Sequence, residues 1–281
     1  MLVADDEDNV LRVYDGRRGG APVRTLDLSP MLGLARGARA PELDLEAATR
    51  MGESAYWMTS HGRSSSGKAA PARLRFFATR GHGDASTLEL VGPPYRHLVD
   101  DLVASPQLEQ FHLDKAAALP PKEEGGLNLE GMTAMPDGRS ILIGFRSPVP
   151  DGKALLVPLL NAEDVVQGTS ASFGPPVLLD LGGLGIRSLS WWRGRYLIIG
   201  GGVASGTASK LFTWKGGGDR PVAVPGVDLG SLNPEAFISP EESDEILLLS
   251  DDGSVEENNV ACKKQKNAAA KRFRGKWIRL L

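Results

Sequence analysis

Short apolar runs joined by polar turns recur along this chain, and the clearest copy spans residues 127–148. Two hydrophobic runs, residues 131–135 and 141–145, flank the sequence Pro-Asp-Gly-Arg. This punctuation is typical of a tight turn, so the stretch predicts an antiparallel hairpin. In an antiparallel pair the start of the first strand lies beside the end of the second, which is expected to bring Glu130 and Arg146 to one sheet edge.

Three further stretches repeat the hairpin, at residues 43–63, 186–202 and 232–253. The first and last of them place Glu46 and Glu235 where the clearest copy has Glu130. The remaining copy, residues 186–202, keeps the strand, turn, strand pattern. It replaces the glutamate by a residue near Ser188 and ends in glycines.

A third apolar run follows each hairpin after a variable loop, at residues 72–79, 153–160, 210–215 and 274–280. A fourth follows in three copies, at residues 87–91, 176–181 and 220–224. Four short strands per unit, repeated at roughly 40 to 60 residues, predict an all-β propeller. We expect five blades of four antiparallel strands, with six as the alternative, in a single domain over residues 1–281.

The first and last units are each one strand short. Residues 2–5, 10–14 and 23–28 supply the second to fourth strands of the first blade, and the last copy supplies only its first three. An open seam would leave unpaired backbone groups at the sheet edges. We therefore expect two further strands, upstream of Met1, to complete both blades.

Residues 95–118 interrupt the strand pattern. Leu98, Leu102 and Val103 stand at helical spacing ahead of a Ser-Pro break, which predicts a pair of short helices packed on the ring. His97 and His112 lie in this insertion, and neither has a partner at metal-binding spacing. We therefore expect both histidines to have a structural role, on the helix surface or in the core, and not to bind a metal.

Composition excludes several classes of protein. The chain is 41% hydrophobic and 24% charged, which is ordinary for a globular domain. A net charge of -3 gives no general attraction to nucleic acid or to an anionic membrane. With one cysteine no intrachain disulfide can form. Since the sequence also has no apolar run long enough to span a bilayer and no signal peptide, we expect a cytoplasmic protein.

The loop lengths differ between the two faces of the predicted ring. The turns that join first to second strands are tight, whereas long loops join second to third strands at residues 61–71, 146–152, 202–209 and 252–271. Binding sites usually lie on long loops held by a rigid scaffold. On this face we expect charged and polar residues from the starts of first strands and the ends of second strands to converge: Glu46, Glu130, Glu235, Asp5, Asp6, His61, Arg146, Asp251 and Asp252.

Three glutamates around one axis repel one another unless a positive charge lies between them. Either Arg146 pairs with one of them, or Glu46, Glu130 and Glu235 hold a hard cation. Calcium fits such an oxygen-rich set, since clustered His or Cys is lacking. Two structural alternatives stay open: the glutamates hydrogen-bond backbone groups of the next blade, and Asp251 with Asp252 caps a turn.

The stretches 128–148 (NLEGMTAMPDGRSILIGFRSP), 2–15 (LVADDEDNVLRVYD) and 44–48 (DLEAA) resemble a bacterial family catalogued as domain of unknown function 3616. That resemblance implies a propeller without an assigned activity. The Glu-Gly-Met-Thr start of a blade also resembles the propellers called phytase-like or esterase-like. This second resemblance implies a hydrolase with a metal or phosphate site, carried to Glu130 and, by internal repeat, to Glu46 and Glu235.

Two hypotheses of function follow. In the first, the propeller binds a small ligand or a metal and hydrolyses a phosphoester or another ester. Glu46, Glu130 and Glu235 hold the cation, Arg146 neutralises developing negative charge, and His61 or Asp251 moves the proton. In the second, the protein is a non-catalytic scaffold whose loop face binds a protein partner.

Overall fold

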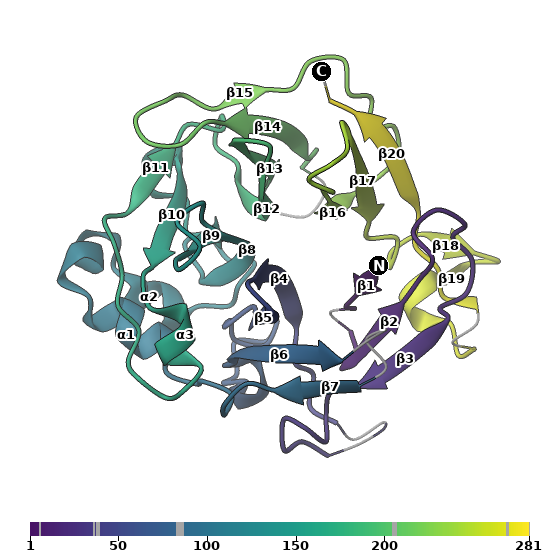
Figure 1. The fold of residues 1–281 in the computed structure, drawn as a ribbon, viewed down its shortest axis with the longest axis horizontal. Coiled ribbons are helices and arrows are strands. Elements are labelled where there is room, and N and C mark those ends of the chain that lie inside the picture. The colour runs from purple at the N-terminus through teal and green to yellow at the C-terminus, as the bar shows by residue number, and fades with distance from the viewer. Residues whose placement is uncertain are drawn as a thin grey trace.

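The computed structural model describes residues 1–5, 7–35, 37, 40–82, 87–203, 207–267 and 270–280. Within these residues, five antiparallel sheets are arranged around a common axis, as Figure 1 shows. The protein is a five-bladed β-propeller with a small helical content. The prediction of an all-β, five-bladed ring is confirmed.

The strands follow the chain from the axis outward in each blade. The first blade contains β1 (Leu2–Val3), β2 (Val10–Val13) and β3 (Arg24–Asp27). The second contains β4 (Leu45–Met51), β5 (Ser54–Thr59), β6 (Phe76–His82) and β7 (Thr87–Leu90). The third contains β8 (Asn128–Ala134), β9 (Ile141–Ser147), β10 (Ala154–Leu159) and β11 (Val177–Leu179).

The fourth blade contains β12 (Gly185–Trp192), β13 (Arg195–Gly201), β14 (Lys210–Trp214) and β15 (Val222–Ala223). The fifth contains β16 (Pro234–Ile238), β17 (Glu245–Ser250) and β20 (Gly275–Arg279). A separate two-stranded hairpin, β18 (Glu256–Glu257) and β19 (Val260–Ala261), belongs to the loop between the last two of these strands. As the sequence indicates, the described parts of the first and fifth blades have three strands each.

The turn between β8 and β9 shows why the repeated hairpin forms. The Asp137 carboxylate accepts hydrogen bonds from the backbone N–H groups of Arg139 at 2.9 Å and Ser140 at 2.8 Å. Gly138 adopts a φ of 70°, which lies in the left-handed region that glycine enters without steric cost. Local turn chemistry therefore favours the hairpin without help from tertiary contacts.

Apolar side chains fill the spaces between neighbouring blades. One cluster joins the second and third blades, with Phe76 and Ile143 fully buried, and others join the first to the second, the third to the fourth and the fourth to the fifth. Among the described residues no such cluster joins the fifth blade to the first. Their contacts include an edge-to-face pair of Tyr14 and Phe273, with centroids 5.3 Å apart, and an ion pair of Lys263 and Glu7 at 3.0 Å.

The insertion between the second and third blades folds as the short helices α1 (Leu98–Ala104), η3 (Pro106–Phe111) and α2 (Leu113–Ala118) on the outside of the ring (Figure 1). Their apolar residues join the cluster between those two blades. His97 is exposed and lies 2.9 Å from Asp100, and His112 is exposed as well. The remaining helical turns are η2 (Pro71–Arg73), η4 (Pro150–Gly152), α3 (Ala162–Val165) and η5 (Cys262–Lys264). In the described part of the chain no helix is long and apolar enough to cross a bilayer.

Candidate functional site

Four of the innermost strands carry a β-bulge at an equivalent place, and each bulge holds a charged residue. In the second blade, Leu45 pairs with Thr59 and Ala47 with Met58, so Glu46 is the extra residue of the bulge. A bulge re-aims a side chain and often occurs beside a functional site. The same irregularity recurs in the third, fourth and fifth blades, and the four residues, called here the bulge ring, are Glu46, Glu130, Arg187 and Glu235.

The fourth member of the bulge ring is Arg187, where the sequence repeat indicated a residue near Ser188. Arginine replaces glutamate in this blade, so the repeat could not be followed by residue identity. A usable signal lies three residues upstream of the charged position, where every copy has a leucine: Leu43, Leu127, Leu184 and Leu232. When the copies are aligned on that leucine, Arg187 falls at the position that the three glutamates occupy in the other copies.

Glu130 and Arg146 form a buried ion pair at the start of β8 and the end of β9. The Nη1 of Arg146 lies 2.7 Å from Oε1 of Glu130, and the two side chains are 9% and 6% exposed. The Nδ2 of Asn128 donates a second hydrogen bond, of 2.6 Å, to the same oxygen. Burial raises the pKa of the Glu130 carboxyl, while the positive charges of Arg146 and Arg187 act in the opposite direction.

Arg146 also joins the third blade to the fourth. Its Nε donates to the carbonyl of Gly202 at 3.1 Å, and its Nη2 lies 3.4 Å from the carbonyl of Val203. The backbone of Arg146 passes so close to Gly185 that a Cβ atom on Gly185 would lie 1.9 Å from the Arg146 carbonyl oxygen. The guanidinium therefore neutralises Glu130 and ties two blades together at once.

Arg187 forms an ion pair with Glu235 of the next blade. Burial lowers the pKa of Arg187, as does the charge of Arg146, whereas Glu130, Glu46 and Asp251 raise it. By ladder register, Arg187 occupies the same place in the fourth blade as Glu130 in the third. Together Arg146 and Arg187 supply two positive charges to the three glutamates of the bulge ring, and they are the counter-charge that the sequence required.

No metal centre is evident from side-chain positions. Within the described residues, no group of three or more His, Cys, Asp or Glu side chains is close enough to hold a metal ion. Glu130 and Glu235 are each paired with an arginine, and Glu46 is half-buried. Of the two arrangements left open by the sequence, the structure contains the arginine pairing.

His61 follows the end of β5 and is 3% exposed. Its Nδ1 lies 2.8 Å from the carbonyl oxygen of Thr59, so Nδ1–H donates and Nε2 is left as an acceptor. Burial lowers the pKa of His61 to about 4. By ladder register, Arg146 is equivalent to Ser60, one place before His61, so the structure places Arg146 and His61 at successive positions of the repeat.

The aspartates at the end of β17 make local contacts. Asp251 is exposed, and its carboxylate accepts from the backbone N–H of Gly253 at 2.7 Å, as in a capped turn. Asp252 is buried, accepts from the Ser250 hydroxyl at 2.8 Å and pairs with Arg274 at 2.8 Å.

At the N-terminal end of the chain, Asp5 lies 3.8 Å from Arg12. Asp6 lies outside the described residues.

Buried polar atoms without a hydrogen-bond partner gather on one face of the ring. Within the described residues, six side-chain atoms have this property, and all lie at the starts of first strands, the ends of second strands or the starts of third strands. These positions share the loop-rich face because neighbouring strands are antiparallel. We call this face of the ring, around its central axis, the loop-rich mouth. The six atoms are His61 Nε2, Arg75 Nε, Asn128 Oδ1, Ser147 Oγ, Arg187 Nε and Ser209 Oγ.

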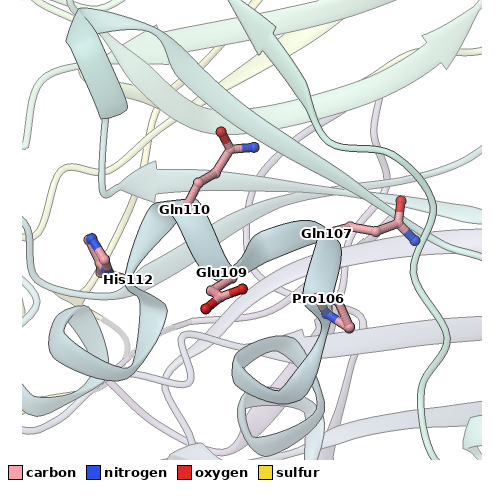
Figure 2. A pocket seen from close by; sticks show the side chains of 5 residues that line it. All are labelled: Pro106, Gln107, Glu109, Gln110 and His112. Atoms are coloured by element: carbon pink, nitrogen blue, oxygen red, sulfur yellow. The ribbon is translucent and has the colours of Figure 1, made fainter.

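A surface pocket of about 300 Å³ lies elsewhere, on the helical insertion, lined by Pro106, Gln107, Glu109, Gln110 and His112. Figure 2 shows that the side chains of Gln107, Gln110 and His112 point in different directions. The Nε2 of Gln107 is already bonded to the carbonyl of Phe173 at 3.0 Å. Because these groups do not converge on one point, we place the candidate site at the loop-rich mouth.

Comparison with known proteins adds a family. A family model described as "Protein of unknown function (DUF3616)" matches residues 81–224, which include the 128–148 stretch. The other two stretches that carry the resemblance lie outside the matched region. No curated protein matches the chain.

Among solved structures, the chain is similar to the β-propeller domain of the Trilobed protease from Pyrococcus furiosus. The two are 11% identical, with a TM-score of 0.29, and the match covers 73% of this chain. It covers 47% of that structure, so the chain spans just under half of its length.

Proposed function

This chain belongs to the DUF3616 family, and we propose that its loop-rich mouth binds a small polar ligand. The observation that carries the proposal is the gathering of the six unpartnered buried polar atoms on that one face. A buried polar atom without a partner costs free energy, so each such atom in a native protein calls for an explanation by water, an ion or a ligand.

The geometry of the mouth supports this proposal in two further ways. The bulge ring brings charged side chains from four blades toward one axis, and the second blade contributes His61 beside them along the same face. The rigid sheets beneath hold the starts of all these strands in register. Such convergent polar groups on a rigid scaffold are what orient a small ligand.

The test is a mapping experiment. The isotope-labelled protein is titrated with a panel of small polar compounds, charged and uncharged, and backbone amide shifts are followed by NMR. We expect the shifted amides to cluster at the starts of β8 and β12 and the ends of β5 and β9. Shifts clustered on the helical insertion instead, or no binding by any compound, would refute the proposal.

The proposal has a hydrolytic extension. For this, Glu130 and Glu235 would have to exchange their arginine partners for a calcium ion shared with Glu46, and the ion would polarise an ester or a water. Arg146 would neutralise developing charge, and His61 or Asp251 would move the proton. The feature that favours this extension is that Glu46, Glu130 and Glu235 share one place in the repeat with Arg146 beside them, although the pairing of Glu130 with Arg146 opposes it. It requires hydrolysis of nitrophenyl acetate or nitrophenyl phosphate that depends on calcium and is lost in Glu130→Gln.

The alternative is a non-catalytic scaffold that binds a protein partner. The bonds from Arg146 to Gly202 and Val203 favour it, because they give the arginine a purely structural use between two blades. A scaffold of this kind should bind none of the small compounds at the mouth. It should also retain a protein partner when Arg187, which does not make those bonds, is changed to methionine.

A further inference from the structure

The unpartnered atoms of the mouth include both hydrogen-bond acceptors and hydrogen-bond donors. The Nε2 of His61 and the Oδ1 of Asn128 are acceptors and require a donor. The Nε of Arg187 is a donor and requires an acceptor. The hydroxyl of Ser147 can serve as either. A ligand that satisfies this set must therefore carry both donors and acceptors.

Three of these residues are brought to one place where the second and third blades meet. Asn128 and Ser147 are direct partners across the β8–β9 ladder. The backbone N–H of Leu129 donates to the carbonyl of Ser60 at 3.0 Å, which sets His61 beside the start of β8. A Cβ atom on Gly62 would lie 3.1 Å from the carbonyl of Leu127, so the two segments run in contact.

The charged groups at this place are mostly bonded to one another. Glu130 pairs with Arg146 and Glu235 pairs with Arg187, while half-buried Glu46 adds a third carboxylate. A divalent cation would have to displace an arginine from Glu130 or Glu235, and a phosphate would have to displace a carboxylate from Arg146 or Arg187, and breaking such a buried pair is costly. An uncharged molecule carries no such penalty.

We propose that the ligand of the loop-rich mouth is an uncharged small molecule with several hydroxyl groups, of the polyol or monosaccharide class. Each hydroxyl group donates one hydrogen bond and accepts others. Such a molecule can donate to His61 Nε2 and Asn128 Oδ1 and accept from Arg187 Nε, with Ser147 serving in either sense. This inference rests on the proposed function and names the chemical class of its ligand.

The experiment is a calorimetric titration of the full chain with myo-inositol and glucose, with calcium chloride, sodium phosphate and sodium acetate as charged probes. We expect heat of binding from at least one of the two hydroxylated probes and none from the charged ones. Binding by the charged probes alone, mapped to the mouth by amide shifts, would refute this inference and leave the proposed function standing. Binding by no probe at the mouth would refute both.

Ser147→Ala supplies a matched variant because its hydroxyl has no partner within the fold. Loss of one hydrogen bond to a ligand should weaken affinity by about fivefold, while the Tm of the free protein stays the same or rises. The control is Ser140→Ala, a buried serine just before Ile141, the first residue of the same strand, whose side chain and backbone N–H both bond to Asp137. Ser140→Ala should lower the Tm and leave affinity unchanged. An unchanged affinity in Ser147→Ala would contradict the assignment of the binding place.

Discussion

At the scale of single residues, this protein buries charged groups near its axis by pairing them. Arg146 satisfies Glu130 and also two carbonyl groups of the next blade, so its charge is neutralised and most of its N–H groups are bonded. Removing one partner of such a pair leaves an uncompensated buried charge, and that penalty exceeds the net gain from the pair itself. Replacing one residue of the pair should therefore destabilise the protein strongly, whereas replacing both together should cost less than the two single changes combined.

We predict that Glu130→Gln or Arg146→Met lowers the free energy of unfolding by about 3–5 kcal/mol. The double variant Glu130→Gln/Arg146→Met should cost less than the sum of the single changes, because no lone charge remains. Urea denaturation measures these values. Lys263→Ala, which breaks an exposed pair with Glu7, is the control and should cost less than about 1 kcal/mol. Additive losses in the double variant would contradict the pairing.

His61 should make stability depend on pH. Its pKa of about 4 in the folded protein lies below the ordinary 6.5, so the unfolded chain binds the proton first as the pH falls. The contribution of the neutral imidazole is complete above pH 6.5 and is lost between pH 6.5 and 4. The loss amounts to about 3 kcal/mol.

Unfolding experiments across this pH range on wild type and His61→Gln test the prediction, and the variant should show the shallower slope. His112→Gln changes an exposed histidine and should retain the wild-type slope. Parallel slopes for wild type and His61→Gln would show that another group controls the acid sensitivity.

At the scale of elements, the innermost strands are specialised by their bulges and by close backbone approach. In four of the blades the bulge turns one charged residue toward the mouth, which a regular strand with strict alternation would not do. Gly185 opens β12 where the backbone of the preceding blade passes, and the space holds no side chain. The first residues of these strands thus set both the chemistry of the mouth and the spacing of the blades.

Gly185→Ala should therefore destabilise the protein by about 3 kcal/mol or more, since its Cβ would meet a backbone oxygen of Arg146 that cannot move alone. Thermal and urea unfolding measure the loss. Gly218→Ala is the matched control: nothing lies within 4 Å of its added Cβ, and its effect should be small. Equal stability of the two variants would mean that the third and fourth blades do not approach as closely as described.

At the scale of the whole molecule, the ring is packed unevenly. The third blade lies between two apolar clusters, whereas the first and fifth blades each contact one, and their shared seam is held by polar and aromatic contacts among the described residues. Local opening is cheapest where few apolar contacts are lost. The seam is therefore the expected place for the ring to loosen.

Hydrogen–deuterium exchange should show this difference. Amides of β2 and β17, next to the seam, should exchange at least about tenfold faster than those of β9 in the third blade. The strand β13 of the fourth blade provides an internal reference, since apolar clusters lie on both of its sides. Uniform protection in all five blades would show that the seam is as stable as the other junctions.

The sequence by itself determined the repeat, the strands and the loop-rich face on which we propose the site. Turn chemistry such as Asp137-Gly138 and period-two apolar runs are local properties, so they can be read without knowledge of the fold. The antiparallel rule then placed Glu130 beside Arg146, and the structure has them in contact. Counting apolar runs also predicted that the first and fifth blades would have three strands each in the described part of the chain.

Only the tertiary structure decided which charges meet and which polar atoms stay unpaired. Arg187 escaped the repeat because arginine stands there in place of glutamate, and its ion pair with Glu235 of the next blade forms only when the two blades pack together. The burial of His61 and the turn-capping contacts of Asp251 likewise depend on how the loops fold over the ring. The burial and pairing of a side chain depend on residues that are distant in the sequence. They are therefore decided only when the blades close around the axis.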